Sequence, residues 1–314
     1  MKKFILKAIA FLVIIGAILL ASLFLLPNNV FKNTLMGGLI EKNALLARSG
    51  SPKIILIGGS SVSYGTDSRK ISEAFHMPVI DMAISADIGL KFMGDDIKPY
   101  INKGDVVVVG VENFAFAKDY PEDFEGSETL VGIIFDIDQD GKRYIDFKQW
   151  VELSAYIPQY SASKLVNLIT PVFKRTGSNY LYSRKSFNQY GDSYLHWTMP
   201  NEPFADDEKC TGKEEINPDA FAYLNQFNKY VLSRGATMVI IPPATENASY
   251  QNREFFIKKV EAEFKRNRLP LIAEPSRYRF QRKYFFNMPY HLNKSGVDLR
   301  TGLVIQDLSK VILK

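Results

Sequence analysis

The stretch from Ile54 to Gly65 constrains the fold more than any other part of the chain. It reads Ile-Ile-Leu-Ile-Gly-Gly-Ser-Ser-Val-Ser-Tyr-Gly. Four consecutive aliphatic residues are typical of a strand that is buried on both faces of a parallel sheet. The two glycines allow a sharp turn, and a helical pattern begins near Ser68. This order predicts a serine hydroxyl at the carboxyl edge of the sheet, where open α/β sheets bind ligands. A capping serine in an ordinary Gly-Ser turn is the other interpretation.

Strand and helix patterns alternate along the rest of the chain. Further strands are expected at 79–84, 105–110, 238–241 and 271–272. Helical patterns cover 39–48, 68–75, 87–100, 218–234, 252–266 and 295–313. The alternation predicts an α/β fold, a three-layer α/β/α sandwich with a mostly parallel sheet. Residues 115–215 break the rhythm and are interpreted as one long insertion.

The N-terminal segment predicts a membrane anchor. Ala8 to Leu26 are 19 residues without a charge, about the length that spans ~30 Å of hydrocarbon as a helix. Lys2, Lys3 and Lys7 predict a cytoplasmic N-terminus and an extracytoplasmic C-terminal domain. A cleaved signal peptide is the alternative, but the apolar run is long and no clean small-x-small site follows it. We therefore expect a single-pass protein of the cell membrane, with an uncleaved anchor over 1–27, a linker over 28–51 and an α/β domain over 52–314.

Composition narrows the classes of partner. The only cysteine is Cys210, so an internal disulfide is excluded. The net charge of +5 is carried by dispersed lysines and arginines, which disfavours nucleic acid; anionic lipid, an anionic glycan or a solvated basic surface remain. No metal site or cofactor is expected. The run from Asp136 to Gly141 resembles the start of a calcium loop, but Phe147 stands at its twelfth position instead of Glu. A glycine turn between two short strands is the preferred interpretation there.

A second motif lies near the C-terminus. The segment Tyr284-Phe-Phe-Asn-Met-Pro-Tyr-His-Leu-Asn-Lys-Ser-Gly296 contains His291, one of three histidines. With the Gly-x-Ser of Gly59 to Ser61, and with Gly65 four residues on, it resembles the SGNH/GDSL hydrolase superfamily. The segment 286–296 is most similar to the membrane-anchored, polysaccharide-modifying branch. That branch includes alginate O-acetyltransferase-like proteins and the D-alanine transfer protein of teichoic acid. The resemblance covers most of residues 50–314.

The resemblance implies a role for each motif residue. Ser61 is the expected nucleophile and His291 its base, because a neutral serine needs a base within hydrogen-bond reach. The oxyanion would be bound by the backbone N–H groups of Ser61 and of Ala86, which stands where the family has glycine. Asn113 is the candidate second donor, although it lies one residue further from Gly110 than in Gly-x-Asn. An asparagine there is also a common turn residue.

The third catalytic position departs from the family. Related sequences have an aspartate just upstream of the histidine, whereas no Asp or Glu lies between Glu274 and His291. Asn287 is the polar candidate to orient the imidazole, and Cys-His-Asn arrangements do support catalysis elsewhere.

Two functions follow from these residues. The first is an extracytoplasmic serine-dependent O-acyltransferase or esterase that acts on a cell-surface or exported polysaccharide. The resemblance implies that a multi-spanning membrane acyltransferase delivers the acyl group. The alternative is a non-catalytic SGNH-like subunit that binds glycan or scaffolds an export or modification complex. The aromatic segment Tyr180 to His196 fits a lid or a sugar-binding wall, or plain packing.

Overall fold

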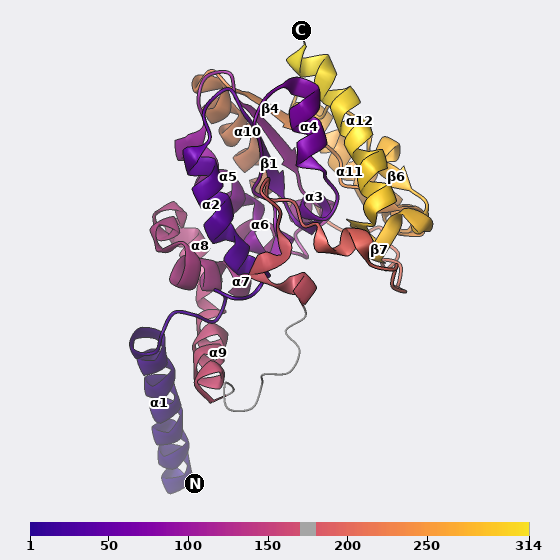
Figure 1. The fold of residues 1–314 in the computed structure, drawn as a ribbon. Helices are drawn as coiled ribbons and strands as arrows, with labels where there is room; N and C mark the ends of the chain where they lie inside the picture. Colours follow the sequence, from indigo (N-terminus) through magenta and orange to yellow (C-terminus); the bar gives the residue numbers. More distant parts are fainter. Residues whose placement is uncertain (170–179, 314) are drawn as a thin grey trace.

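A parallel sheet of four strands forms the centre of the molecule. The structure is a computed structural model that describes residues 1–169 and 180–313. The strands are β1 (Ile54–Gly58), β2 (Val79–Asp81), β3 (Val106–Gly110) and β4 (Thr237–Ile240), in the order β2-β1-β3-β4 (Figure 1). A parallel bridge from Ile240 to Leu271 continues the sheet beyond β4, where a fifth short strand was expected. The predicted mixed α/β architecture with a parallel sheet is confirmed.

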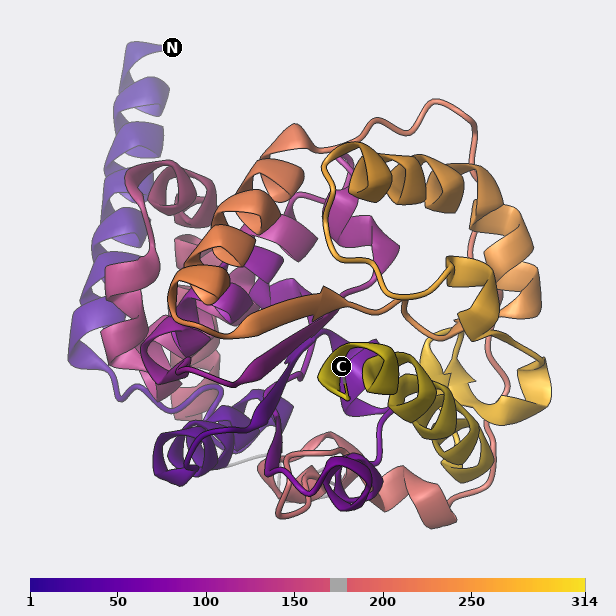
Figure 2. The same ribbon diagram turned by 90° about the horizontal axis from the view of Figure 1, so that it is seen from above.

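The alternation of side chains along the strands gives the domain two cores. Ile55 and Ile57 of β1 belong to one apolar cluster, whereas Ile54 and Leu56 belong to the other. Helices α2 (Leu39–Arg48), α5 (Leu90–Ile97), α10 (Pro218–Ser233) and α11 (Asn247–Arg266) contribute to the first cluster. Helices α4 (Ser68–Phe75) and α12 (Lys294–Ile312) contribute to the second (Figure 2). Both faces of the sheet are therefore buried, as the unbroken aliphatic strands require.

Three of the expected elements differ clearly in extent, and one of them, the helix predicted over 252–266, begins earlier, at Asn247. The strand predicted over 79–84 ends at Asp81, whose side chain accepts a hydrogen bond from the Ala83 N–H at 2.8 Å and turns the chain. The helix predicted over 87–100 is divided. Gly89, with φ of 85°, separates a short 3-10 turn from α5, because this backbone conformation interrupts a helix.

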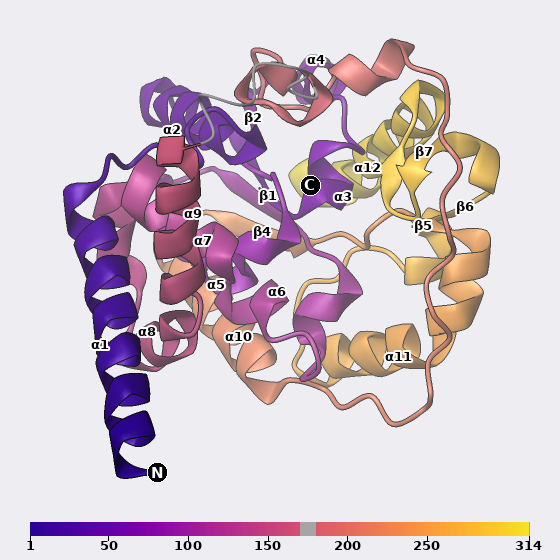
Figure 3. The same cartoon turned by 90° about the horizontal axis from the view of Figure 1, so that it is seen from below.

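The N-terminal helix α1 (Lys2–Leu25) stands away from the sheet beside α9 (Ile157–Ile169), as Figures 1 and 3 show. In the described part of the chain it is the one helix long and apolar enough to cross a membrane. The Ser22 hydroxyl donates to the Ser161 carbonyl at 3.0 Å. The buried Lys164 ammonium donates to the Leu23 carbonyl at 2.8 Å. This lysine satisfies one of the carbonyls that the last turn of a helix leaves unpaired.

The described part of the segment between β3 and α10 begins with several helices. It contains α6 (Glu122–Glu125), α7 (Glu128–Gly132), α8 (Phe147–Ser154) and α9. The glycine turn expected around Gly141 is wrong, because a π-helical turn and a 3-10 helix occupy this region. The Asp136 carboxylate accepts hydrogen bonds from the Phe31 N–H at 2.8 Å and the Tyr160 hydroxyl at 2.5 Å. It therefore ties the linker to the insertion.

The remaining elements are short and lie mostly in connections. The helix α3 (Ser60–Ser63) follows β1, and two small sheets pair β5 (Thr245–Glu246) with β6 (Arg279–Phe280) and β7 (Phe285–Met288) with β8 (His291–Leu292). The described residues also form short 3-10 helices and one π-helical turn, η5 (Ile133–Ile137). The 3-10 helices are η1 (Leu35–Gly38), η2 (Ala86–Ile88), η3 (Lys98–Tyr100), η4 (Asn113–Phe116), η6 (Gln139–Tyr144), η8 (Tyr180–Tyr182), η9 (Arg184–Ser186), η10 (Leu195–Thr198), η11 (Pro275–Tyr278) and η12 (Arg282–Tyr284).

Candidate active site

Ser61 lies in the turn that follows the central strand β1. The turn consists of Gly59 and the single helical turn α3, and the Ser61 side chain is fully buried. Because the four strands are parallel, the carboxyl ends of β2 and β3 lie at the same edge of the sheet. The serine is therefore at the position that the sequence predicts.

Two buried, oppositely charged side chains bind the main chain of Ser61. Its N–H donates to the Glu112 carboxylate at 2.7 Å. Its carbonyl accepts a hydrogen bond from the Arg300 guanidinium. Glu112 follows β3, Arg300 belongs to α12, and both side chains are buried. We name this arrangement, Glu112–Ser61–Arg300, the main-chain clamp. Hydrogen bonds to charged groups are the stronger ones in proteins, so the clamp holds the turn firmly.

The clamp explains the two glycines of the motif. A Cβ atom at Gly59 would lie 2.2 Å from Glu112 Oε2. A Cβ atom at Gly65 would lie 2.2 Å from the Ser61 carbonyl oxygen and 2.3 Å from Arg300 Nη1. Each glycine therefore leaves the room that one charged group of the clamp occupies.

His291 is contributed to the site by the C-terminal part of the chain. It begins β8, which pairs antiparallel with β7 and packs against α3. His291 Nδ1 lies 3.0 Å from Asn287 Oδ1, and the Asn287 amide donates to the Tyr182 hydroxyl at 2.7 Å. The amide N–H₂ group is thus engaged by Tyr182, and the amide oxygen faces the histidine. Only the tautomer with a proton on Nδ1 can donate to that oxygen, which leaves Nε2 as the acceptor.

The surroundings keep His291 neutral. Its ring stacks on Tyr64 at a centroid distance of 4.3 Å and an interplanar angle of 8°. Burial lowers the pKa of His291 to about 3, and the neighbouring His196 acts in the same direction. The imidazole therefore stays unprotonated over the physiological pH range and is available as a proton acceptor.

The aromatic segment Tyr180 to His196 covers this pair. The Ser193 N–H donates to the Ser63 carbonyl at 3.0 Å, and the His196 ring lies 4.9 Å from that of Tyr64. Ser61 is 0% exposed and His291 only 4%. The segment therefore packs directly beside the candidate site. Its use as a lid or as a sugar-binding wall stays a prediction.

In the described part of the chain, no hydrogen bond joins Ser61 to His291. Among the described residues, the Ser61 hydroxyl makes no hydrogen bond of good geometry, and the side chain with which it interacts is that of Glu112 and not that of His291. Catalytic hydrogen bonds often form only once substrate is bound. The structure thus brings Ser61, His291 and Asn287 into one site and shows the His291–Asn287 contact, while the Ser61–His291 contact stays a prediction.

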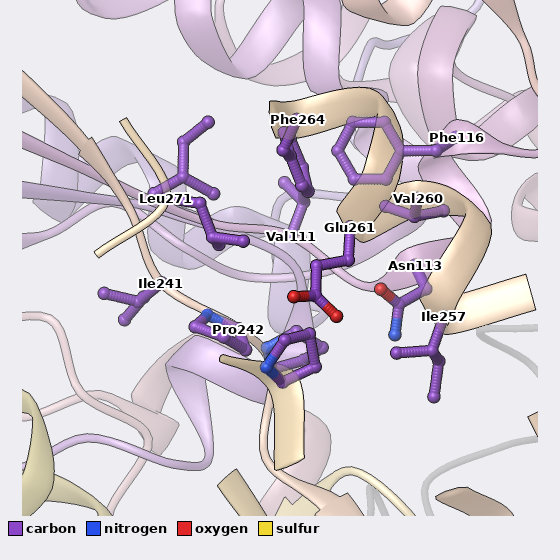
Figure 4. Close-up of a pocket in the computed structure, with 13 residues that line it drawn as sticks. Val111, Asn113, Phe116, Ile241, Pro242, Ile257, Val260, Glu261, Phe264 and Leu271 are labelled. Atoms are coloured by element: carbon purple, nitrogen blue, oxygen red, sulfur yellow. The ribbon is translucent and has the colours of Figure 1, made fainter. Parts of the chain in front are cut away.

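The two proposed oxyanion residues occupy different surroundings. Ala86 is half-buried at the start of η2, on the connection that follows β2. Asn113 lines a small pocket with Ile257 and Glu261 of α11 (Figure 4). Glu112 is the extended residue before η4 and its carboxylate faces Ser61, whereas Asn113 is the first residue of η4 and its side chain lines this pocket. The oxyanion roles of Ala86 and Asn113 stay predictions.

Sequence reasoning missed the two charged residues of the main-chain clamp. One signal was present for Glu112: counted from Gly110, it occupies the asparagine position of Gly-x-Asn. For Arg300 there was no local signal, because it lies 239 residues from Ser61 in the chain.

Comparisons with known proteins assign the chain to no family. No protein-family model matches the chain, and no curated protein matches it. The fold is similar to the crystal structure of protein YxiM of Bacillus subtilis, with a TM-score of 0.37 and 11% sequence identity. The match covers 82% of this chain and 56% of that one, so the chain spans little more than half of its length.

The clamp predicts the effect of adding one methyl group at each glycine. Gly59→Ala and Gly65→Ala should each destabilise the protein by about 1–3 kcal/mol, because the new Cβ collides with Glu112 or with Ser61 and Arg300. Gly302→Ala, in α12 with nothing within 4 Å, is the matched control and should stabilise by up to about 1 kcal/mol. Thermal unfolding of the full chain in detergent measures all three. Equal stability of the three variants would contradict the tight packing around the clamp.

Proposed function

We propose that the chain is an SGNH-like, extracytoplasmic serine-dependent O-acyltransferase or esterase that modifies a cell-surface or exported polysaccharide. The observation that supports this most is the His291–Asn287 hydrogen bond beside a buried serine at the carboxyl edge of the sheet. The bond selects the tautomer whose Nε2 can accept a proton. The three-layer, SGNH-like arrangement belongs to the same proposal.

The proposed reaction uses these groups in order. Ser61 Oγ attacks the acyl carbonyl while His291 Nε2 takes its proton. The developing oxyanion would be bound by the N–H groups of Ser61 and Ala86. His291 then returns the proton to the leaving group, and the acyl group remains on Ser61. A glycan hydroxyl, deprotonated by His291, attacks this ester and releases Ser61. Water in place of the glycan gives hydrolysis.

Asn287 favours transfer over hydrolysis in this scheme. It orients His291 but offers no charge to stabilise the imidazolium, and burial also opposes protonation of the ring. The resulting base is weak. The buried position of Ser61 and His291 limits access of water, so a bound acceptor hydroxyl would compete well with hydrolysis.

The helix α1 supports a place at the membrane. It is long and apolar enough to span a bilayer, and Val166 and Leu168 of the neighbouring α9 are exposed. Such a position would let an acyl group arrive from a multi-spanning membrane acyltransferase and would keep the domain near exported glycan.

A non-catalytic glycan-binding or scaffold role is the second candidate. The observation that favours it is the Glu112 carboxylate, which occupies the Ser61 N–H that an oxyanion would need.

Removing either member of the catalytic pair should abolish acyl transfer. Ser61→Ala and His291→Ala should each lower the rate by at least about 10³-fold, and the double variant should be little worse, because such residues act as a unit. Ser60→Ala, at the neighbouring half-buried hydroxyl, is the matched control. The measurement is mass-spectrometric detection of an acyl or phosphonyl adduct on Ser61 after treatment with an activated ester or a fluorophosphonate. Acyl transfer that survives in Ser61→Ala, or the absence of an adduct on Ser61 in the unmodified protein, would leave the binding role as the better proposal.

Changing Asn287 to a carboxylate should strengthen the base. In serine proteases the converse change, aspartate to asparagine, costs about 10⁴-fold. We expect Asn287→Asp to raise ester hydrolysis by more than about tenfold and to lower the ratio of transfer to hydrolysis. The variant should also raise the pKa of His291 from about 3, because a neighbouring carboxylate favours the charged ring. The acidic limb of the pH–rate profile should then move to higher pH. Tyr182→Phe, which removes only the partner of the Asn287 amide, tests the same contact, and unchanged profiles in both variants would argue against it.

The orientation of α1 is testable with fusions. A reporter placed after Lys314 should be active only outside the cytoplasm, because Lys2, Lys3 and Lys7 hold the short N-terminus inside. Replacing the three lysines by glutamines is the control that should reduce this preference. Cytoplasmic activity of the unmodified fusion would overturn the polysaccharide proposal, since enzyme and exported glycan would be in different compartments.

A further inference from the structure

The environment of Glu112 is unusual for a structural carboxylate. One oxygen, Oε1, accepts from the Ser61 N–H at 2.7 Å. The other, Oε2, is buried and has no donor in good hydrogen-bond geometry among the described residues, although the Ser61 hydroxyl also interacts with the carboxyl group. The side chain is only 4% exposed. An ionised carboxylate normally binds donors with both oxygens when it is buried, so half of this group is left unsatisfied.

The Glu112 carboxyl group binds a main-chain donor that an acyl substrate would need. The N–H of a nucleophilic serine is the group that binds the carbonyl oxygen of an acyl substrate during transfer. Here the Glu112 carboxyl takes that N–H, and Gly59 provides the space for it, since a Cβ at Gly59 would lie 2.2 Å from Oε2. Glu112 therefore stands where the carboxylate or oxyanion of an acyl compound would stand.

We propose that Glu112 is a built-in occupant of the acyl-oxygen subsite at Ser61, and that loss of its negative charge is the step that opens this subsite to an acyl substrate. The proposal rests on the proposed acyl transfer. An ionised Glu112 repels a developing oxyanion and competes for the Ser61 N–H. A neutral Glu112 is a weaker acceptor, and its O–H can donate a hydrogen bond to the oxyanion. In that form it performs the task that the family gives to asparagine at this position of Gly-x-Asn.

The charged and titratable groups around Glu112 come from several elements. Arg300 of α12 favours the ionised form, as does the Ser61 N–H of α3. Asp123 of α6 and Tyr290, between β7 and β8, also interact with it. The balance is set by burial, which raises the pKa of Glu112. The same neighbourhood raises the pKa of Asp123 to about 8, through burial and the Glu112 charge.

The sign of the pH dependence follows from these groups. Lowering the pH converts Glu112 to its neutral form, whereas His291, with a pKa of about 3, remains an unprotonated base. Acylation of Ser61 should therefore become faster as the pH falls through the raised pKa of Glu112. Control by His291 alone would give no such rise, because acidification can only remove that base.

The first experiment measures acylation of Ser61 in the full chain with p-nitrophenyl acetate between pH 4.5 and 8.5. The wild type should be at least about tenfold faster at pH 5 than at pH 8. Glu112→Gln, which is neutral at every pH, should be at least about tenfold faster than the wild type at pH 8 and nearly independent of pH. Glu261→Gln, in the adjacent Asn113 pocket, is the matched control and should behave as the wild type. A Glu112→Gln variant that is slower at every pH, or as acid-activated as the wild type, overturns the proposal.

A second experiment does not depend on catalysis. Glu112→Ala empties the subsite, so acetate should bind beside the Ser61 N–H and raise the unfolding temperature of this variant by about 3 °C at ten times its Kd. The wild type and Glu112→Gln should show no such rise, and Glu112→Ser serves in place of the alanine variant if that variant does not fold. If acetate binds to Glu112→Ala but Ser61 is acylated in none of the proteins, the proposed function is wrong. Glu112 then remains the occupant of an anion subsite. No acetate effect in Glu112→Ala or Glu112→Ser overturns the occupancy itself.

Discussion

The main-chain clamp at Ser61 is the interaction on which the rest of the site depends. A carboxylate and a guanidinium, both buried, bind the N–H and the carbonyl of one residue. Neither charge could be buried alone without a large desolvation cost, and removal of one partner would leave the other uncompensated. Because Glu112 follows β3 and Arg300 belongs to α12, the clamp also joins the central sheet to the last helix. The serine turn is thereby fixed by elements that are distant in sequence.

An amide beside His291 orients the ring without adding a charge. Asn287 is half-buried, and its amide donates to the Tyr182 hydroxyl. A carboxylate in its place would raise the pKa of His291, because a neighbouring negative charge favours the charged ring. Asn287 supplies the acceptor that fixes the tautomer without that charge, and Tyr182 holds the amide the right way round. With a neutral amide beside it, His291 is a weaker base. A weak base suits transfer between bound groups better than attack by water.

The sequence predicts the framework of this site because local patterns determine it. The aliphatic runs at 54–57 and 105–110 correspond to β1 and β3, and the helix expected over 39–48 matches α2 in its bounds. Asn113 was preferred over Glu112 because a family pattern was applied with a one-residue shift. The chain turns into η4 at Asn113, so Glu112 lies against Ser61 and Asn113 lines the neighbouring pocket. Neither Arg300 nor Tyr182 carries a local signal, since each reaches the site only through tertiary packing.

The same packing couples the aromatic segment to the orientation of the base. Ser61 and His291 are buried, and the segment Tyr180 to His196 packs on Tyr64 beside them. Tyr182 lies in that segment and accepts the hydrogen bond that orients the Asn287 amide. A movement that carries Tyr182 away releases this amide, and a rotated amide would present N–H₂ groups to His291 Nδ1 and favour the opposite tautomer. The arrangement with Tyr182 in place is therefore the one that favours a proton on His291 Nδ1 and leaves Nε2 as the acceptor.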